Sequence, residues 1–132
     1  MKRVRRSHTK PELTLRKALH RMGLRYVIGD TRLPGTPDLT FPKYRAAVFV
    51  HGCFWHGHEC RQGRRPSTNL EYWVPKIEAN IKRDRRKEQA LHDLGWRPLT
   101  VWECQLKGAA VRATIGELIK KMAPLHARQL KF

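Results

Sequence analysis

Two of the three cysteines of this 132-residue chain, and three of its histidines, lie in one polar stretch at residues 51–60, where they could bind a metal ion. Cys53, His58 and Cys60 lie within eight residues, and Cys104 would complete a set of four from far along the chain. Three thiolates and one imidazole form a tetrahedral set that structural zinc prefers. Because four protein ligands leave no open position, such an ion would brace the loop rather than catalyse. The alternative is ordinary buried cysteines beside surface histidines.

Two large aromatic residues, Phe54 and Trp55, stand between two glycines in the same polar stretch. Large aromatic side chains are costly to expose unless they pack or bind. In a basic protein they could insert between base pairs of DNA and stack there. The alternative is that one or both cap the core beside the metal site.

Carboxylates are scarce in this sequence, and one of them occupies a position suited to binding metal. Asp38 follows Pro37 in a turn-rich segment and directly precedes a strand-like run. A carboxylate oxygen there could hold Mg²⁺. The alternative is a turn aspartate that caps its own backbone.

The hydrophobic pattern predicts the elements that must position these residues. Thr9 and Glu12 have the spacing of a capping box that begins a helix, and Gly23 ends that helix. The strand-like run at residues 45–50 is rich in small and β-branched residues, which is typical of a buried central strand. The predicted strands are residues 25–28, 39–41, 45–50 and 97–102.

Two more helices complete the pattern. One spans residues 71–94 and the other is a final amphipathic helix. The long helix is expected to turn Trp73, Ile77, Ile81, Leu91 and Leu94 inward and Lys82, Arg83, Arg85 and Arg86 outward, and the last helix is marked by Val111, Ile115, Leu118, Ile119 and Met122. The order predicts an α/β fold with helices packed on a mixed sheet. We expect one domain over residues 1–132, with a basic arm at 1–8 and a basic tail at 124–132.

The composition favours a polyanionic partner. The chain carries 28 Lys and Arg against 11 Asp and Glu, a formal net charge of +17. Nucleic acid is the leading candidate for that charge, and a merely basic protein or one resting on anionic membrane is the alternative. No secretory signal or long apolar run is seen. The odd number of cysteines argues against a disulfide framework and favours a reducing cytosol.

Several ordered motifs resemble those of the very short patch repair endonucleases. They include Pro-Gly-Thr-Pro-Asp at 34–38, His-Gly-Cys-Phe-Trp-His-Gly-His-Glu-Cys at 51–60, Asn-Ile-Lys-Arg-Asp-Arg-Arg at 80–86 and Val-Trp-Glu-Cys at 101–104. The match covers residues 4–107 in unbroken order. The resemblance implies a restriction-endonuclease-like fold with a structural zinc. It also implies hydrolysis of the phosphodiester 5′ of the thymine in a T:G mismatch left by deamination of 5-methylcytosine.

The resemblance also implies a role for individual residues. Asp38 matches the metal-binding aspartate, and the main-chain carbonyl of Val50 falls where the family supplies a second Mg²⁺ contact. His56 matches the histidine of proton transfer or water activation, His51 is its active-site neighbour, and Glu12 supports the site. The remaining matches are Cys53, His58, Cys60 and Cys104 as zinc ligands and Phe54 and Trp55 as the wedge. Lys82, Arg83, Arg85 and Arg86 are expected to contact phosphates.

The chain departs from the family pattern in small ways. Val50 stands where other members have Thr, which is harmless if only the carbonyl binds metal. The Glu-x-Lys half of the nuclease motif reads Phe49-Val50-His51, which leaves fewer carboxylates for metal. The chain begins about where family members have an intercalating N-terminal helix, so we expect a weaker clamp on DNA.

The implied partner is double-stranded DNA with a T:G mismatch, in the bacterial cytoplasm at the nucleoid. A mismatch-repair protein is a further candidate partner, no membrane is involved, and a monomer is expected. One rival is a nuclease of the same fold with another DNA target. A second is a zinc-braced DNA-binding module without catalysis, against which Asp38 and His56 argue. A third, a small RNA-binding protein, explains the charge but not the loop of aromatic and histidine residues.

Overall fold

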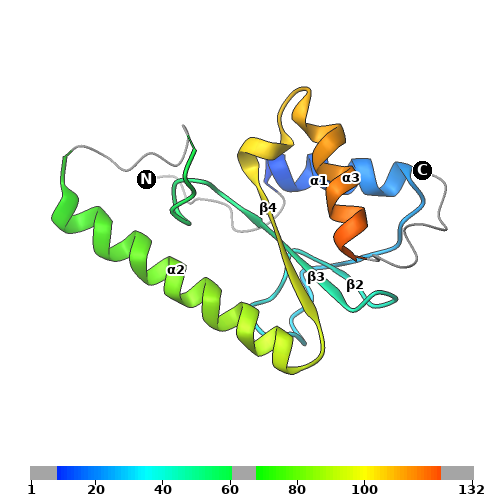
Figure 1. The fold of residues 1–132 in the computed structure, drawn as a ribbon, viewed down its shortest axis with the longest axis horizontal. Helices are drawn as coiled ribbons and strands as arrows, with labels where there is room; N and C mark the ends of the chain where they lie inside the picture. Colours follow the sequence, from blue (N-terminus) through cyan, green and yellow to red (C-terminus); the bar gives the residue numbers. More distant parts are fainter. Residues whose placement is uncertain (1–8, 61–67, 123–132) are drawn as a thin grey trace.

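The computed structural model describes residues 9–60 and 68–122, so the expected basic arm and basic tail lie outside the described residues. Its elements follow the predicted order of helix, three strands, helix, strand and helix (Figure 1). They are α1 (Lys10–Arg21), β1 (Val27–Ile28), β2 (Leu39–Phe41), β3 (Ala46–His51), α2 (Leu70–Asp93), β4 (Arg97–Trp102), the 3₁₀ helix η1 (Glu103–Leu106) and α3 (Ala110–Met122).

The four strands form one mixed sheet in the order β1-β2-β3-β4. The first three strands are antiparallel, and β3 pairs in parallel with β4. A short turn joins β2 to β3, and Arg45 takes a left-handed backbone there (φ 51°) just before β3 begins. The parallel pair needs a long crossover, and α2 is the element that provides it.

Alternate residues of β3 supply two different layers of the molecule. Ala46 and Val48 face α1 and α3, whereas Ala47 and Phe49 pack against Leu91 of α2. Figure 1 shows α2 on one side of the sheet and α1 and α3 on the other. Because strand side chains alternate between faces, His51 at the end of β3 points to the α2 side. The α2 side therefore carries the one titratable side chain of β3.

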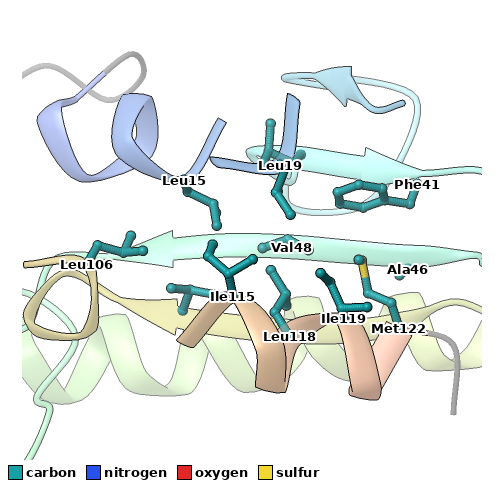
Figure 2. Close-up of a cluster of buried hydrophobic side chains, with 12 residues drawn as sticks. Leu15, Leu19, Phe41, Ala46, Val48, Leu106, Ile115, Leu118, Ile119 and Met122 are labelled. Carbon is teal, nitrogen blue, oxygen red and sulfur yellow. The ribbon is translucent and has the colours of Figure 1, made fainter. Parts of the chain in front are cut away.

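The main core lies between the sheet and the pair α1 and α3. Figure 2 shows side chains from the two helices meeting Val48 of the central strand. Burial of one such Leu or Ile side chain stabilises a fold by about 1.5–3 kcal/mol, so this layer fixes the sheet that positions the site. The labelled members are Leu15, Leu19, Phe41, Ala46, Val48, Leu106, Ile115, Leu118, Ile119 and Met122.

The predicted start of α1 is confirmed. The Thr9 Oγ1 atom accepts a hydrogen bond from the Glu12 N–H (3.4 Å), and Gly23 takes a positive φ of 78° after the helix ends. The Glu12 side chain is only 2% exposed, and its carboxylate lies 3.5 Å from Arg16. The Glu12 backbone N–H therefore takes part in the cap at the helix start, whereas the Glu12 carboxylate lies in the protein interior.

The inward face of α2 agrees with the prediction except at its end. Ile77 and Leu91 are buried, Trp73 and Ile81 are half-buried, and the four predicted outward cations are exposed. The prediction is wrong for Leu94, which is 55% exposed. Leu94 follows the last residue of α2 and lies in the turn through Gly95 (φ 81°), beyond the face that contacts the sheet.

No helix among the described residues has the length and apolar character that crossing a membrane requires.

Candidate active site and metal-binding cluster

Two histidines and one aspartate form a compact group at the end of β3. The His51 and His56 rings are stacked, with centroids 3.8 Å apart and planes within 3°. The local turn explains this, because the His56 N–H donates to the Gly52 carbonyl (3.2 Å) and returns the chain over the strand. Asp84 of α2 lies opposite, with Oδ2 2.6 Å from His56 Nδ1 and Oδ1 4.0 Å from His51 Nε2.

The surroundings of this group fix its charges. Burial lowers the pKa of His51 to about 4, and the charge of His56 adds to the effect, so His51 is neutral at pH 7. Burial would raise the pKa of Asp84, but its hydrogen bond with His56 and the two imidazoles outweigh burial and lower it. An ionised carboxylate only accepts hydrogen bonds, so the proton between them resides on His56 Nδ1. With Nδ1 bound to Asp84, Nε2 is the ring nitrogen through which His56 could exchange a proton with a substrate.

Asp38 occupies a second position on the same side of the site, at the start of β2. Its Oδ2 atom accepts a hydrogen bond from the Val50 N–H (2.7 Å), so the carboxylate is fixed by the neighbouring strand rather than by its own turn. Burial raises the pKa of Asp38 to about 7; the Val50 N–H opposes this rise and the Glu12 carboxyl, which hydrogen-bonds to Asp38, adds to it. A buried carboxyl group, Glu12, and a half-buried one, Asp38, thus share one small region.

The carboxyl pair suits a divalent cation. The negative charge of Asp38 is disfavoured because it is buried and meets a second acid, Glu12. Carboxylate oxygens are the ligands that Mg²⁺ prefers, and a cation would supply the opposite charge that these groups need. The structure brings the predicted residues Glu12, Asp38, His51 and His56 to the same end of the sheet.

The four predicted zinc ligands are brought together. The ligand atoms of Cys53, His58, Cys60 and Cys104 all lie within 4.8 Å of one another. The Cys104 Sγ atom lies 3.6 Å from His58 Nδ1, a separation that two ligands of one tetrahedral zinc ion would have. Burial and neighbouring thiols raise the pKa of Cys53 to about 12, so the thiol needs a bound cation to lose its proton at neutral pH.

Trp102, the last residue of β4, connects the cysteine cluster to the histidine pair. The His58 ring stacks on the indole, with centroids 4.0 Å apart and planes within 13°. The edge of the same indole contacts His51, with centroids 5.3 Å apart. Glu103 adds a second connection, because its Oε1 atom accepts the Cys53 N–H (3.1 Å). The cysteine cluster and the imidazoles therefore share contacts through both Trp102 and the segment that Glu103 holds.

The predicted wedge residues form an aromatic cluster with the beginning of α2. Phe54 and Trp55 contact one another, with centroids 5.3 Å apart, and both contact Trp73, at 5.3 and 5.8 Å. Tyr72 lies beside Trp73 at 4.8 Å. Trp55 is nevertheless 41% exposed, and its carbonyl accepts a hydrogen bond from Asn80 (2.9 Å). Trp73 therefore packs against both Phe54 and Trp55, while part of the Trp55 indole is exposed to solvent and could contact a partner.

Sequence reasoning gave no part in the site to three residues that the structure places there, although it expected Trp73 to face inward. Asp84, Lys87 and Trp73 all come from α2, far along the chain from the histidines. A signal was present for Asp84, because it stands at helical spacing from Ile77 and Ile81 on the face that turns inward. A carboxylate on an otherwise apolar helix face needs a partner, and His56 is that partner.

Comparisons with known proteins agree with this geometry. Residues 1–62 match the family described as DNA mismatch endonuclease Vsr. The type II nicking enzyme V.XorIIP of Xanthomonas oryzae pv. oryzae is 54% identical over 106 residues, which cover 80% of this chain and 78% of that protein. The DNA mismatch endonuclease Vsr of Escherichia coli is 44% identical over 108 residues, covering 82% of this chain and 69% of that protein.

A solved structure supports the fold alone. The catalytic domain of the homing endonuclease I-Bth0305I superposes with a TM-score of 0.59 at 21% identity, over 89% of this chain and 97% of that chain. The predicted α/β nuclease fold with a mixed sheet is thereby confirmed. Extensive sequence identity over most of both chains identifies the family, and the chain belongs to the Vsr family of DNA nicking endonucleases.

Proposed function

We propose that this nicking endonuclease cuts one strand of duplex DNA 5′ of the thymine in a T:G mismatch, in very short patch repair of deaminated 5-methylcytosine. One observation carries the proposal. The exposed indole of Trp55 directly precedes His56, whose ring is held by Asp84. Mismatched steps unstack at low cost, so an aromatic wedge beside the proton acceptor couples detection of the mismatch to cleavage.

A second candidate function is nicking of undamaged duplex at a defined sequence. The chain is 54% identical to a protein named as a type II nicking enzyme and 44% identical to one named as a mismatch endonuclease. Both candidates would use the same catalytic residues, so substrate tests separate them.

Two kinds of metal ion fit the donor sets described above. Asp38, supported by Glu12, would hold the catalytic Mg²⁺ together with the main-chain carbonyl of Val50. When bound, Mg²⁺ would stabilise charge on the phosphate and lower the pKa of a bound water. The structural zinc would be held by Cys53, His58, Cys60 and Cys104.

The side chains of Asp84 and His56 would determine where the proton of the attacking water goes. Asp84 holds the Nδ1 proton of His56, which leaves the Nε2 lone pair to accept a proton from the attacking water. The water oxygen bonds to phosphorus, the bond from phosphorus to the leaving oxygen breaks, and that oxygen takes a proton from solvent. His51 remains neutral and stacked on His56, so it limits rotation of the catalytic ring without competing for the proton.

The outer face of α2 would contact the DNA backbone. The four cations predicted to face outward are all exposed, and helices with such a basic face bind phosphates without reading sequence. The residues are Lys82, Arg83, Arg85 and Arg86. The enzyme would act as a monomer in the bacterial cytoplasm at the nucleoid, and a mismatch-repair protein is the candidate protein partner.

The test uses three labelled duplexes that differ at one base pair, T:G, C:G or T:A, with Mg²⁺. We expect the wild type to nick 5′ of the thymine of T:G alone, Asp38→Ala to be inactive, and the exposed Asp93→Ala to act as the wild type. Equal nicking of the matched duplexes would favour the second candidate function. Equal nicking by Asp38→Ala would remove the proposed mechanism.

A further inference from the structure

Lys87 lies on the same side of α2 as Asp84, three residues further along the helix. Its stem passes against Gly35, in the turn that leads to Asp38. A Cβ atom added at Gly35 would lie 2.7 Å from both Lys87 Cγ and Cδ, and Gly35 has a positive φ of 78°. The turn therefore needs a glycine both for its backbone and to leave room for the lysine stem.

The Lys87 side chain is positioned beside two charged groups of the site, because its stem lies against the turn before Asp38 and it follows Asp84 by three residues on α2. Its charge acts on Asp38, His51 and Asp84, lowering the pKa of each, and these groups come from three different elements. Lys87 is the smallest of the causes acting on each group, and its effect agrees with the geometry, in which its stem lies against the turn that leads to Asp38. Among the described residues, no carboxylate lies within ion-pair distance of Lys87. Its positive charge is thus shared across the site and committed to no single acid.

We propose that Lys87 is a further catalytic residue, whose ammonium contacts a non-bridging oxygen of the scissile phosphate and stabilises the negative charge that develops there. This inference rests on the proposed nicking reaction, whichever DNA target it uses. Lys87 exchanges no proton: the water proton still passes to His56, and the phosphorus–oxygen bonds form and break as above.

The charge balance of the site is the physical reason for such a group. Glu12, Asp38 and Asp84 are three acids around a substrate that is itself an anion. His51 is neutral at pH 7 and offers no positive charge. An ammonium whose stem is held by the turn at Gly35 would gain contact as charge grows on the phosphate and would thereby lower the barrier to reaction.

The test compares Lys87→Met, which keeps the stem against Gly35 but removes the charge, with Lys87→Arg, which keeps the charge. Lys120→Met on α3 is the matched control, because that side chain is 74% exposed and α3 lies on the opposite side of the sheet from α2. Single-turnover nicking is measured with Mg²⁺ on a duplex that the wild type cuts. DNA affinity is measured with Ca²⁺ in place of Mg²⁺, and thermal unfolding is recorded for each variant.

We expect Lys87→Met to nick about 100-fold more slowly, at the lower end of what loss of one preorganised charge donor costs. Its DNA affinity should stay within about threefold, as for one phosphate contact among several. Lys87→Arg should recover most of the rate, and Lys120→Met should match the wild type. The loss should persist from pH 6 to pH 9.

Two outcomes would overturn the proposal while leaving the nicking function intact. The first is a Lys87→Met enzyme as fast as the wild type. The second is full recovery of its rate at pH 9, which would mean that Lys87 acts only by keeping Asp38 ionised. A folded wild type that nicks no duplex at all would overturn the proposed function together with this inference.

Discussion

Replacing Asp38 by Asn should stabilise the protein when no Mg²⁺ is present, because the native carboxyl is held where its charge is disfavoured. Asn keeps the shape of the side chain and can still accept the Val50 N–H that Asp38 now accepts at 2.7 Å. The substitution therefore removes the charge and little else. Catalysis should be lost at the same time, so stability and activity should change in opposite directions.

The size of the gain follows from the pKa of Asp38, which rises from 3.8 to about 7. The folded protein keeps the proton up to about pH 7, whereas the unfolded chain releases it near pH 4. The free energy of unfolding therefore falls as the pH rises between these values, and the loss is complete above pH 7. At about 1.4 kcal/mol for each pKa unit, the full loss is about 4 kcal/mol. The Asp38→Asn protein has no ionisable group at this position, so its stability does not fall in this way.

The assay is thermal unfolding of both proteins between pH 4 and pH 8, without Mg²⁺ and without chelator, so that metal on the cysteine cluster is kept. The two melting temperatures should coincide near pH 4 and separate by about 10 °C at pH 8, at about 2–4 °C for each kcal/mol. Added Mg²⁺ should raise the melting temperature of the wild type alone. Asp93→Asn, at an exposed carboxylate, serves as the control. The reasoning would be refuted if the two melting temperatures differed by the same amount at every pH. It would also be refuted if Asp38→Asn were less stable than the wild type at pH 8.

Three further predictions concern the other parts of the site. Cys104→Ser should reduce the zinc content from about one ion per chain to none by native mass spectrometry, and retained zinc would contradict the assigned ligand set. Trp55→Ala should weaken binding to T:G duplex about 10- to 100-fold, since one stacked base is worth about 1–3 kcal/mol; because Trp55 is 41% exposed, its melting temperature should barely change, and a large drop would indicate a structural role instead. Arg86→Ala should weaken binding to matched and mismatched duplex alike and reduce the salt dependence of log Kd by about one unit, whereas a loss confined to T:G would mean that Arg86 reads the mismatch.

Local sequence signals were sufficient for most of the scaffold. Thr9 caps a helix because its hydroxyl reaches a backbone N–H three residues away, which is a local event. The small, β-branched run of β3 is buried on both faces, as its composition indicates. Leu94 shows the limit of this reasoning, because periodicity gives the face of a helix but does not say where the sheet beneath it ends.

The candidate site was predictable only in part, since two of its members, Asp84 and Lys87, come from α2. His51 and His56 are near neighbours in sequence, and their motif predicted them together. Asp84 and Lys87 reach the same place only because the crossover helix packs on the sheet with that side turned inward. That orientation depends on how Leu91 meets Phe49, which is a property of tertiary packing.

Strand β3 supplies side chains to both faces of the sheet, so its register decides which residue enters the core and which enters the candidate site. Val48 enters the core and His51 enters the catalytic group only because an odd number of steps separates them along the strand. Inserting or deleting one residue between Val48 and His51 would place both side chains on the same face of β3, so that one of them would leave its proper layer. The spacing between these two residues must therefore stay odd if the molecule is to keep both a folded interior and a working nuclease.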